Sequence, residues 1–399
     1  MEYATIPGSD MRASRVALGT WAIGGWLWGG TDETESVRAI HAALDAGVNI
    51  IDTAPVYGFG RSEEIVGKAV AAYPGQPPLL ATKTALEWTD DGKVARNSTP
   101  ERIAAEVDDS LRRLGVERID IYQVHWPDER VPFEDTAAEM LRLKEAGKIG
   151  AIGVSNYSPA QMDAFAAVAP LATSQPPYNI FERGIEADVL PHCRNKGIAT
   201  LTYGALCRGL LSGRMRPDTA FFGDDLRTWD PKFQSPRFGH YLAAVQALDD
   251  LARGHGRTVL QLAVRFVLDK GADIALWGAR RADQMRPLDG VFGWNLGEED
   301  FRAIDAILAE HVTDPVGPEF MGRRTGTDAG KGFQFVAART ALRRAAAARE
   351  AYWALFSGRP PTSSRMSLAV MRAAWSAVRP TASRAAVSQQ AAWAPQRSV

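Results

Sequence analysis

Cysteine is scarce in this chain of 399 residues, which contains only Cys193 and Cys207. Two cysteines cannot form the disulfide framework of a small secreted domain, so the composition fits the reducing cytoplasm. Long apolar runs are absent too, since none approaches the roughly 18 residues that a membrane-spanning helix needs. The first residues lack the basic and apolar segments of a signal peptide. We therefore expect a cytoplasmic protein without a membrane span.

An excess of charge is also missing, because 46 Lys and Arg residues face 47 Asp and Glu residues. A net charge of −1 gives no global attraction to nucleic acid or to a membrane surface. We expect the partner to be a small molecule, and the sequence indicates no oligomeric state. Apolar residues make up 46% of the chain, which is enough for a sizeable core.

The charge is unevenly spread, and this predicts a boundary near Arg324. Residues 325–399 hold eleven Lys or Arg residues against two acids and are rich in Ala, Ser and Pro. The stretch 337–353 contains good helix formers but little regular apolar patterning. We predict a folded unit over residues 1–324 and a basic tail over residues 325–399 that is disordered or partly helical. A basic arm for an acidic partner and an aberrant terminus are the alternatives.

Before that boundary the chain alternates between two patterns. Eight short apolar runs are typical of buried strands: residues 16–19, 48–52, 79–83, 119–125, 149–155, 171–175, 198–203 and 273–278. Amphipathic patterns typical of helices lie between most of them. This alternation predicts a parallel α/β sheet, and the count of eight favours a closed (β/α)8 TIM barrel over a doubly wound sheet. No G-x-G-x-x-G motif follows the first run, which weakens the dinucleotide-fold alternative.

Several residues predict where helices begin and end. Thr99 and Pro100 indicate a helix start and Gly115 its end, while Ser62 is expected to cap another helix. The seventh and eighth runs are separated by a polar loop over residues 214–241 and by helical segments near 241–254 and 258–269. A long loop there should cover the C-terminal end of the barrel (the mouth), where active sites of this fold lie.

Polar side chains follow successive strand ends. Asp52 closes the second run, Lys83 the third and His125 the fourth, and Tyr57 comes five residues after Asp52. The later runs close in Ser155 and Asn156, in Gln175 and in Tyr203. A carboxylate, a phenol, an ammonium and an imidazole that meet at one mouth suit proton transfer to a carbonyl oxygen. Each residue alone more often has a structural role, but a purely structural role does not explain all four residues together.

The chemistry assigns a task to each of the four. A free phenol has a pKa of about 10, which is high for a proton donor that must also return as a base. We expect the charge of Lys83 to lower the pKa of Tyr57, and Asp52 to pair with Lys83 and keep its ammonium charged. His125 is expected to hydrogen-bond and orient the carbonyl oxygen.

Over residues 12–322 the sequence resembles the aldo-keto reductase superfamily. The resemblance rests on LGTWAIGG (18–25), GVNIIDTAPVYGFGRSEEIVGKA (47–69), ATKT (81–84), YQVHWPD (122–128), IGVSNYS (152–158), QPPYNIFER (175–183), TLTYGALCRGLLSGR (200–214) and WGARRADQ (277–284). It is similar to the bacterial branch that contains stress-protein reductases and polyol- or sugar-oxidising reductases. The resemblance implies an NADP(H)-dependent oxidoreductase in which Asp52, Tyr57, Lys83 and His125 form the catalytic tetrad and Tyr57 is the general acid and base.

The resemblance also implies a cofactor site across the mouth. Ser155, Asn156 and Gln175 match residues that hold the nicotinamide carboxamide, Tyr203 matches the ring that stacks on the nicotinamide, and Gly204–Leu210 matches the pyrophosphate loop. The full set of expected cofactor contacts is Thr20, Trp21, Asp52, Ser155, Asn156, Gln175, Tyr203, Gly204, Ala205, Leu206, Arg208, Gly209, Leu210, Arg214, Gly278, Arg280, Arg281 and Gln284. Selectivity for the 2′-phosphate would rest on Arg280 or Arg281, because a Lys-Ser pair common in the family is replaced by Gly278-Ala279. NADP(H) is preferred, with NAD(H) as the alternative.

Tryptophan and tyrosine side chains are expected to line the substrate pocket. The candidates are Trp21, Trp26, Trp28, Tyr57, His125 and Trp126, a set that suits aldehydes, sugars and polyols. No His, Cys or Asp spacing resembles a zinc site, so no metal is expected. Two other functions stay open: a nucleotide-binding regulatory subunit of the channel-associated reductase-like type, and an aldolase or isomerase that uses Lys83 as a Schiff-base amine.

Overall fold

The computed structural model describes residues 1–322, and the tail predicted over residues 325–399 lies outside the described residues. Eight parallel strands close into a barrel, in the order β10-β11-β12-β3-β4-β5-β8-β9. Their bounds are β3 (Val16–Gly19), β4 (Ile50–Asp52), β5 (Leu79–Thr84), β8 (Ile119–Val124), β9 (Ile149–Ser155), β10 (Thr173–Gln175), β11 (Ala199–Thr202) and β12 (Ile274–Gly278). All eight lie within one residue of the runs expected from the sequence or inside them, and the (β/α)8 barrel is confirmed.

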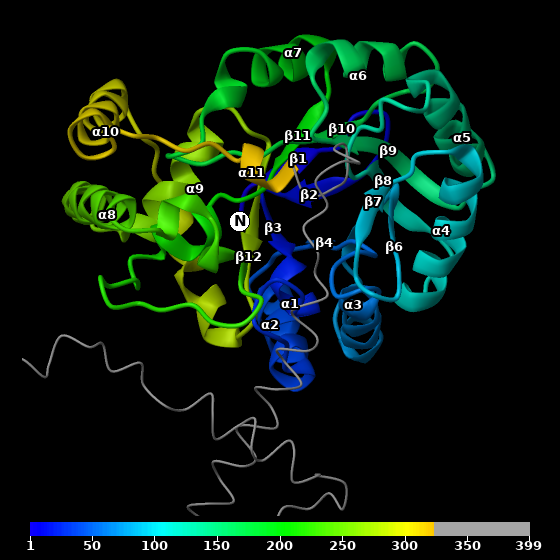
Figure 1. Cartoon of the computed structure of the whole chain (residues 1–399). Helices are drawn as coiled ribbons and strands as arrows, with labels where there is room; N and C mark the ends of the chain where they lie inside the picture. Colours follow the sequence, from blue (N-terminus) through cyan, green and yellow to red (C-terminus); the bar gives the residue numbers. More distant parts are fainter. Residues whose placement is uncertain (323–399) are drawn as a thin grey trace, which may run out of the picture. The chain divides into compact units, whose positions relative to one another are not determined.

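Helices surround the strands on the outside (Figure 1). They are α2 (Glu33–Asp45), α3 (Arg61–Ala72), α4 (Pro100–Leu114), α5 (Phe133–Glu145), α6 (Pro159–Ala166), α7 (Val189–Lys196), α8 (Arg237–Gly254), α9 (Val259–Asp269) and α10 (Glu298–His311), with the short α1 (Trp21–Gly24) and α11 (Glu319–Gly322). None of the helices in residues 1–322 combines the length and the apolar character required to cross a membrane.

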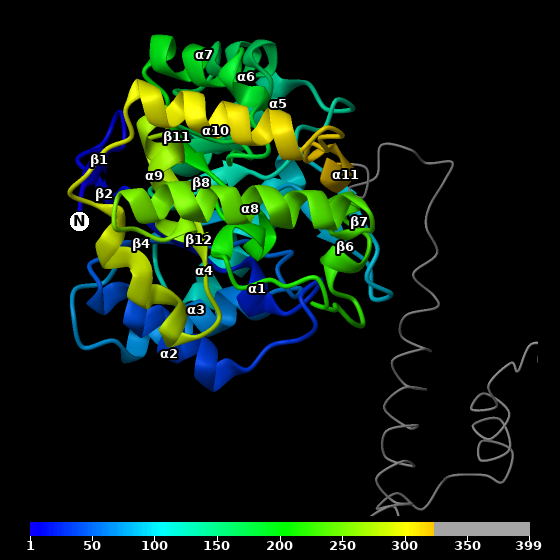
Figure 2. The ribbon, with the colours of Figure 1, turned by 90° about the vertical axis from the view of Figure 1, so that its left-hand side faces the viewer.

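Two small hairpins mark the opposite ends of the barrel. β1 (Tyr3–Thr5) pairs with β2 (Arg12–Ser14), and β6 (Leu86–Trp88) pairs with β7 (Val94–Arg96). Figure 2 shows the first hairpin at one end of the barrel and the second at the other, beside α11. The second hairpin is an insertion after β5, so it lies at the C-terminal end of the strands, where the mouth is.

The local signals for helix ends hold in part. The Thr99 side chain accepts a hydrogen bond from the backbone N–H of Arg102, Pro100 is the first helical residue of α4, and Gly115 ends the helix in the left-handed conformation. The prediction for Ser62 is wrong, because α3 begins at Arg61. The Ser62 hydroxyl instead donates to the hydroxyl of Thr20, 2.8 Å away, and so joins α3 to the chain that leaves β3.

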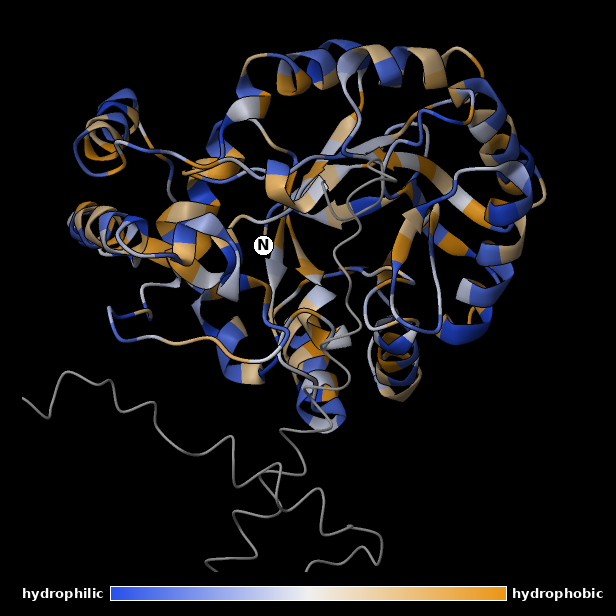
Figure 3. Ribbon diagram, in the orientation of Figure 1, coloured by the Kyte–Doolittle hydropathy of each residue, from blue (hydrophilic) through white to orange (hydrophobic). Residues whose placement is uncertain are grey.

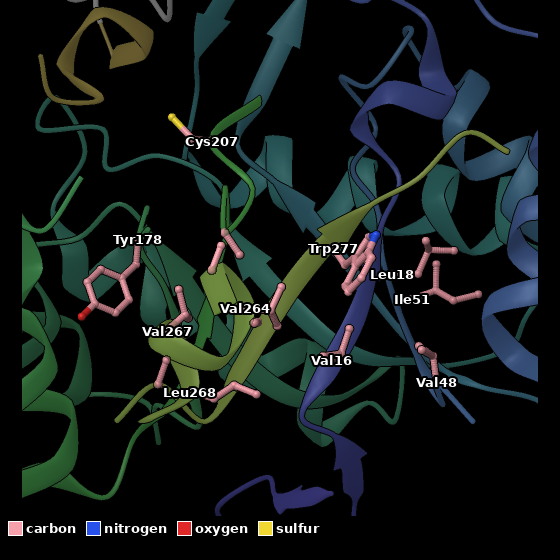
Figure 4. Packing of buried hydrophobic residues seen from close by; sticks show 14 of the residues in the cluster. Val16, Leu18, Val48, Ile51, Tyr178, Cys207, Val264, Val267, Leu268 and Trp277 are labelled. Carbon is pink, nitrogen blue, oxygen red and sulfur yellow. The ribbon is translucent and has the colours of Figure 1, made fainter. Parts of the chain in front are cut away.

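Side chains alternate between the two faces of each strand, and this divides the core in two. Outward residues such as Leu18, Ile51 and Trp277 pack against helices, and Figure 4 shows them in a group that includes Val264 and Val267 of α9. The inward residues Ala17, Ile50, Ala81, Ile121 and Ala151 form a separate interior cluster, with Ile6 and Ala13 of the N-terminal segment packed against it. The helices carry hydrophilic and hydrophobic residues side by side along their length (Figure 3), as expected for helices with one face on a core.

The long segment between β11 and β12 reaches the mouth, as expected. The Asp224 carboxylate accepts hydrogen bonds from the backbone N–H groups of Leu27 and Gly29, at 3.0 and 3.1 Å. The backbone N–H of Leu226 donates to the carbonyl oxygen of Leu27 at 2.9 Å. The loop is therefore fastened to the segment that follows β3.

Candidate active site

The inward face of the barrel changes from apolar to polar along the strands. Ile50, Ala81 and Ile121 belong to the interior apolar cluster. Because side chains on one face of a strand recur every second residue, the next inward positions of β4, β5 and β8 are Asp52, Lys83 and Gln123. All three are buried. The fold thus places a carboxylate, an ammonium and an amide in one layer just below the mouth.

Asp52 and Lys83 form a buried ion pair, as the sequence predicts. The Lys83 Nζ donates to Asp52 Oδ2 at 2.7 Å and to the carbonyl oxygen of Thr53 at 2.9 Å. The other carboxylate oxygen of Asp52 accepts from Gln175 Nε2 at 2.7 Å and from Gln123 Nε2 at 3.4 Å. Gln123 is not among the site residues predicted from the sequence, although it lies two residues after the inward Ile121. A pair with this many partners is held in a fixed position.

Tyr57 is held above this pair by a close backbone contact. A Cβ atom at Gly24 of α1 would lie 2.5 Å from the carbonyl oxygen of Tyr57, and one at Gly58 would lie 2.1 Å from the carbonyl oxygen of Gly24. Glycine is therefore required at both positions for α1 to pack directly on the turn that carries Tyr57. The phenol ring stacks on Trp21, with centroids 6.0 Å apart, and the Lys83 Nζ lies 5.0 Å from its centroid.

His125 lies beside Tyr57. The two ring centroids are 5.7 Å apart and the rings meet edge to face. Both side chains are half-buried, in contrast to the buried Asp52 and Lys83. Within residues 1–322 neither the Tyr57 hydroxyl nor a His125 ring nitrogen forms a hydrogen bond. The four predicted catalytic residues therefore come together, and two of their polar groups are left without a partner at the mouth.

The electrostatics of the four differ from the expectation in one respect. Burial, and then the negative charge of Asp52, raise the pKa of Tyr57 well above 10. The prediction that Lys83 lowers this pKa is thus wrong for this structure, because the ammonium is directed at Asp52 and is neutralised by it. Burial also lowers the pKa of Lys83, although Asp52 opposes this. Burial and then the charge of Lys83 hold the pKa of His125 well below 6.5, so the imidazole is neutral at pH 7.

The residues expected at the nicotinamide carboxamide form a hydrogen-bonded chain. Asn156 Nδ2 donates to Ser155 Oγ at 3.0 Å and to the carbonyl oxygen of His125 at 3.0 Å. The Tyr203 hydroxyl donates to Asn156 Oδ1 at 2.9 Å, and Ser155 Oγ donates to the carbonyl oxygen of Gln175 at 2.8 Å. Asn156 has a left-handed backbone, with φ of 62°, which turns its amide toward Tyr203. The Oε1 of Gln175 accepts no hydrogen bond within residues 1–322.

The loop Gly204–Leu210 follows β11 at the mouth. Gly204 and Gly209 have positive φ values of 79° and 89°, and Ala205 and Leu210 are buried. Arg208 does not direct its guanidinium toward the mouth for a ligand. It is 7% exposed and forms ion pairs with Glu182 at 2.5 Å and Asp230 at 2.6 Å. The Arg208 guanidinium is therefore not available to a cofactor, because carboxylates already pair with it, and the predicted cofactor contact at Arg208 stays a prediction.

Arginines gather where the adenosine end is expected. Arg280 donates from Nη1 to the carbonyl oxygen of Trp28 at 2.9 Å, and none of the carboxylates in residues 1–322 forms an ion pair with it. Arg281 and Arg214 both pair with Asp283, at 3.1 and 3.4 Å. Gln284 Oε1 accepts from the backbone N–H groups of Arg280 and Arg281, and Gly278 is exposed at the end of β12.

One arginine in this region, Arg227, is not among the residues predicted from the sequence. The guanidinium of Arg227 lies 5.2 Å from the ring centroid of Trp28 and pairs with Asp225 at 2.6 Å. Burial, and then the positive charge of Arg227, lower the pKa of Arg280. Arg227 is in a long polar loop without periodicity, so no sequence signal separates it from the neighbouring surface arginines.

The expected pocket aromatics divide into two groups. Trp21, Trp28, Tyr57 and His125 are connected by ring contacts, since Trp21 meets Trp28 edge to face at 5.6 Å. Trp26 packs instead on Phe59, 5.0 Å away, and Phe59 in turn contacts Trp88 of β6. Trp126 lies under the guanidinium of Arg96, which is 5.0 Å from its ring centroid. Thr20 is buried below this group and donates to the carbonyl oxygen of Asp52.

Comparison with known proteins agrees with this geometry. The family model described as "Aldo/keto reductase family" matches residues 15–309. The chain belongs to this family. It is 56% identical over 328 residues to the aldo-keto reductase YhdN of Bacillus subtilis (strain 168), with 82% of this chain and 99% of the relative covered. It is 34% identical over 316 residues to the NADH-specific methylglyoxal reductase of Escherichia coli (strain K12), with 75% and 96% covered.

Solved structures of the family show the same barrel. The glycerol dehydrogenase AKR11B4 of Gluconobacter oxydans is 55% identical, with a TM-score of 0.74, and the match covers 79% of this chain and 98% of that one. The holo form of the aldo-keto reductase AKR11C1 of Bacillus halodurans is 26% identical, with a TM-score of 0.65, and covers 77% and 96%.

Proposed function

We propose that this aldo/keto reductase transfers a hydride between NADP(H) and the carbonyl or alcohol group of a small aldehyde, sugar or polyol. The observation that carries the proposal is a pair of half-buried groups, the Tyr57 hydroxyl and the His125 imidazole, which meet beside a buried ion pair and form no hydrogen bond within residues 1–322. Two such groups at one point can both hydrogen-bond a single oxygen atom.

The residues at the mouth fit a nicotinamide nucleotide. The free Oε1 of Gln175 can accept from the carboxamide, and Tyr203 offers a ring beside it. The buried Trp28 Nε1 has no hydrogen-bond partner among residues 1–322, and it lies near Arg227 and Arg280. An amide acceptor at one end of the mouth and, at the other, Arg280 without a carboxylate partner in residues 1–322 suit a molecule with a carboxamide and phosphates.

The chain's own residues handle the proton. When bound, the reduced nicotinamide supplies the hydride, which forms the new C–H bond at the carbonyl carbon. Tyr57 donates its hydroxyl proton to the carbonyl oxygen, and its raised pKa means that the phenol is fully protonated at pH 7. His125, neutral at this pH, donates a second hydrogen bond to the same oxygen and orients it.

The Lys83 ammonium offsets the negative charge of Asp52, which on its own would disfavour the state after proton transfer. Tyr57 becomes a phenolate, and the Lys83 ammonium is 5.0 Å from its ring. Asp52 keeps that ammonium charged, and Gln175 and Gln123 hold Asp52 in place. In the oxidation of an alcohol the same groups act in reverse, with Tyr57 accepting the proton.

The arginines favour the phosphorylated nucleotide. Arg280 is the best candidate for a 2′-phosphate contact, because it is half-buried and has no carboxylate partner in residues 1–322. Arg227 lies nearby, but Asp225 pairs with it. Arg281 is a weaker candidate, since Asp283 already neutralises it in part. The relative that is NADH-specific is only 34% identical, so NADP(H) remains our proposal and NAD(H) its alternative.

The substrate is proposed to be small and hydroxylated. Trp21, Trp28 and Tyr57 present apolar ring surfaces on which the carbon face of a sugar or polyol can stack. A relative named as a glycerol dehydrogenase, at 55% identity, and one named as a methylglyoxal reductase support three-carbon substrates.

The two other functions fit less well. A Schiff base requires an accessible neutral amine, but Lys83 is fully buried and donates to both Asp52 and Thr53. A regulatory subunit would not need a Tyr57 hydroxyl and a His125 imidazole that form no hydrogen bond within residues 1–322. We therefore expect no trapping of the protein by borohydride in the presence of an aldehyde.

A direct assay tests the proposal. The purified full-length protein is mixed with NADPH or NADH and with methylglyoxal, glyceraldehyde or an aromatic aldehyde, and with NADP+ and glycerol in the reverse direction. We expect nicotinamide absorbance to change only when both nucleotide and substrate are present, with NADPH preferred. The absence of turnover with every carbonyl and both nucleotides, in a protein that binds NADPH, would support the regulatory alternative.

A further inference from the structure

Next to the loop Gly204–Leu210 lies a second cluster of buried charges, which the proposed chemistry does not use. Its members are two acids and two bases with almost no exposure: Glu182, Arg208, Asp230 and Lys232. Glu182 Oε1 accepts from Arg208 at 2.5 Å and from Lys232 at 2.7 Å. Asp230 accepts from Arg208 Nε at 2.6 Å. Burial alone would raise the pKa of Glu182, but the two cations outweigh it and lower this pKa to about 2.

The cluster holds an unfavourable backbone in place. Cys207 and Arg208 both have positive φ, 45° and 55°, which is uncommon for residues with a side chain. Such a conformation persists only where the surroundings fix it. The two carboxylates fix the Arg208 guanidinium, and Asn179 Nδ2 donates to both Glu182 Oε2, at 2.7 Å, and the carbonyl oxygen of Gly204, at 3.0 Å. The loop is thus tied to the cluster at both of its ends.

The C-terminal segment 317–322 covers the same cluster. The Phe320 ring lies 5.2 Å from the Arg208 guanidinium and 5.8 Å from Lys232 Nζ. The Lys232 Nζ also donates to the carbonyl oxygen of Gly317 at 3.2 Å. These contacts come from α11 and the residues before it, at the mouth end of the barrel (Figure 2).

The other end of this segment reaches the proposed substrate side. A Cβ atom at Gly322 would lie 3.3 Å from the Trp126 ring. Arg96 Nη2 donates to the carbonyl oxygen of Gly322 at 3.3 Å while the same guanidinium lies over Trp126. The segment 317–322 therefore contacts the proposed cofactor loop through Phe320 and, through Gly322, Trp126, which the sequence predicts in the substrate pocket.

We propose that Arg208 and Phe320 are positioning residues: through the buried charge cluster, the C-terminal segment sets the conformation of the loop Gly204–Leu210 and hence the affinity for the cofactor. This inference rests on the proposed function, since it takes that loop to be the one that holds the nucleotide. In this proposal Arg208 fixes the conformation of the loop through its ion pairs and does not bind a phosphate of the cofactor.

Loss of the Phe320 ring is expected to weaken cofactor binding, because of the left-handed backbone of the loop. Without the Phe320 ring, the Arg208 side chain loses packing on one side, and the left-handed residues of the loop can relax to ordinary conformations. The cofactor then has to reorder the loop when it binds, which weakens binding and speeds release. A cation–aromatic contact at a largely desolvated site corresponds to a change of about five- to thirtyfold in a binding constant.

The test compares three variants of the full chain with the wild type. Phe320→Ala removes the ring, Phe320→Leu keeps an apolar side chain without the aromatic face, and Phe222→Ala removes a ring of the long mouth loop that is 78% exposed. NADPH binding is followed by quenching of tryptophan fluorescence, and the release rate by displacement in a stopped-flow instrument. Melting temperatures without cofactor show whether each variant is folded.

We expect Phe320→Ala to raise the dissociation constant of NADPH about five- to thirtyfold, mainly through faster release, with Phe320→Leu between it and the wild type. Phe222→Ala should bind as the wild type does. Equal NADPH affinity and release rate in folded Phe320→Ala, or an equal loss in Phe222→Ala, would overturn the inference. A wild-type protein that binds neither NADPH nor NADH would instead overturn the proposed function.

Discussion

At the N-terminal end of the barrel the interior is filled by Ile50, Ala81 and Ile121, and two residues further along the same strands it holds Asp52, Lys83 and Gln123. The strands are the same, and so is the alternation that turns these side chains inward. The apolar end is covered by Ile6 and excludes water from beneath the ion pair. The polar end is left open to a ligand through Tyr57 and His125.

The difference separates stability from chemistry within one barrel. The apolar layer contributes burial, which depends only on volume and contact. The layer above it places charges in a dry environment, where they interact strongly but are costly to desolvate. If this division is correct, substitutions at the two ends should affect different measurements.

The largest effect is expected from Lys83→Met. Without its cation, the buried Asp52 carboxylate would face the developing phenolate of Tyr57, so we expect the rate of reduction to fall by at least about a hundredfold. The matched control is Arg265→Met at the opposite end, where a buried guanidinium pairs with Glu2 and Asp269. Lys83→Met should lose stability by about 3–5 kcal/mol, because it leaves the buried Asp52 carboxylate without its cation. Arg265→Met should lose less, because Glu2 keeps Arg15 and the partly exposed Asp269 keeps the backbone N–H of Leu296.

Single-turnover hydride transfer distinguishes the two variants under conditions where both are folded. We expect Arg265→Met to retain the wild-type rate. A Lys83→Met protein with wild-type turnover, or an Arg265→Met protein that is folded but loses the chemical step, would contradict the division between the two ends.

A smaller effect, on stability alone, is expected from Ile6→Ala. Ile6 is fully buried beneath the barrel, and its truncation should lower the free energy of unfolding by about 2–4 kcal/mol. Denaturant unfolding measures this loss, and kcat/KM at a temperature where the variant is folded should not change. A large loss of kcat/KM in folded Ile6→Ala would show that the two ends are coupled.

At the outer edge of the mouth we expect Arg280→Ala to reduce the preference for NADPH over NADH by roughly tenfold or more. The reason is the loss of one charge-assisted contact to a phosphate, while the common parts of both nucleotides keep theirs. Binding of both nucleotides is measured by fluorescence titration. Arg281→Ala is the comparison, with a weaker effect because Asp283 already pairs with Arg281. An unchanged preference for NADPH over NADH in both variants would show that residues other than Arg280 and Arg281 set the nucleotide selectivity.

The smallest effect is expected from pH. Because the pKa of Tyr57 is raised well above 10 and that of His125 is held well below 6.5, neither group titrates between pH 7 and 9. Reduction needs the protonated phenol, so its kcat/KM should be level over this range, whereas oxidation needs the phenolate and should rise with pH. A fall in reduction centred near neutral pH would show that the phenol pKa is low in the working enzyme.

The sequence predicted most of the fold because its signals are local. Runs such as residues 16–19 and 149–155 coincide with β3 and β9, and the positions of Asp52, Lys83 and His125 at strand ends follow from the run boundaries. The failures involve partners distant in the chain. Ser62 bonds Thr20 instead of capping α3, and the sequence does not indicate the ion pairs of Arg208 with Glu182 and Asp230. No spacing in the sequence indicates that these residues meet.

The pKa of Tyr57 was mispredicted for a related reason. A cation nearby suggests a lowered pKa, but the outcome depends on burial and on which group the cation faces. In the folded barrel Lys83 faces Asp52, and burial dominates. Such competition is decided by three-dimensional distances that a list of residue types does not contain.

The central claim is that the Tyr57 hydroxyl supplies the proton, and Tyr57→Phe tests it most directly. The variant keeps the ring that stacks on Trp21 and removes only the oxygen. We predict that NADPH binding, followed by fluorescence, stays at the wild-type level while the single-turnover rate of carbonyl reduction falls by about a hundredfold or more. A Tyr57→Phe protein that binds NADPH and reduces the carbonyl at the wild-type rate would contradict the account.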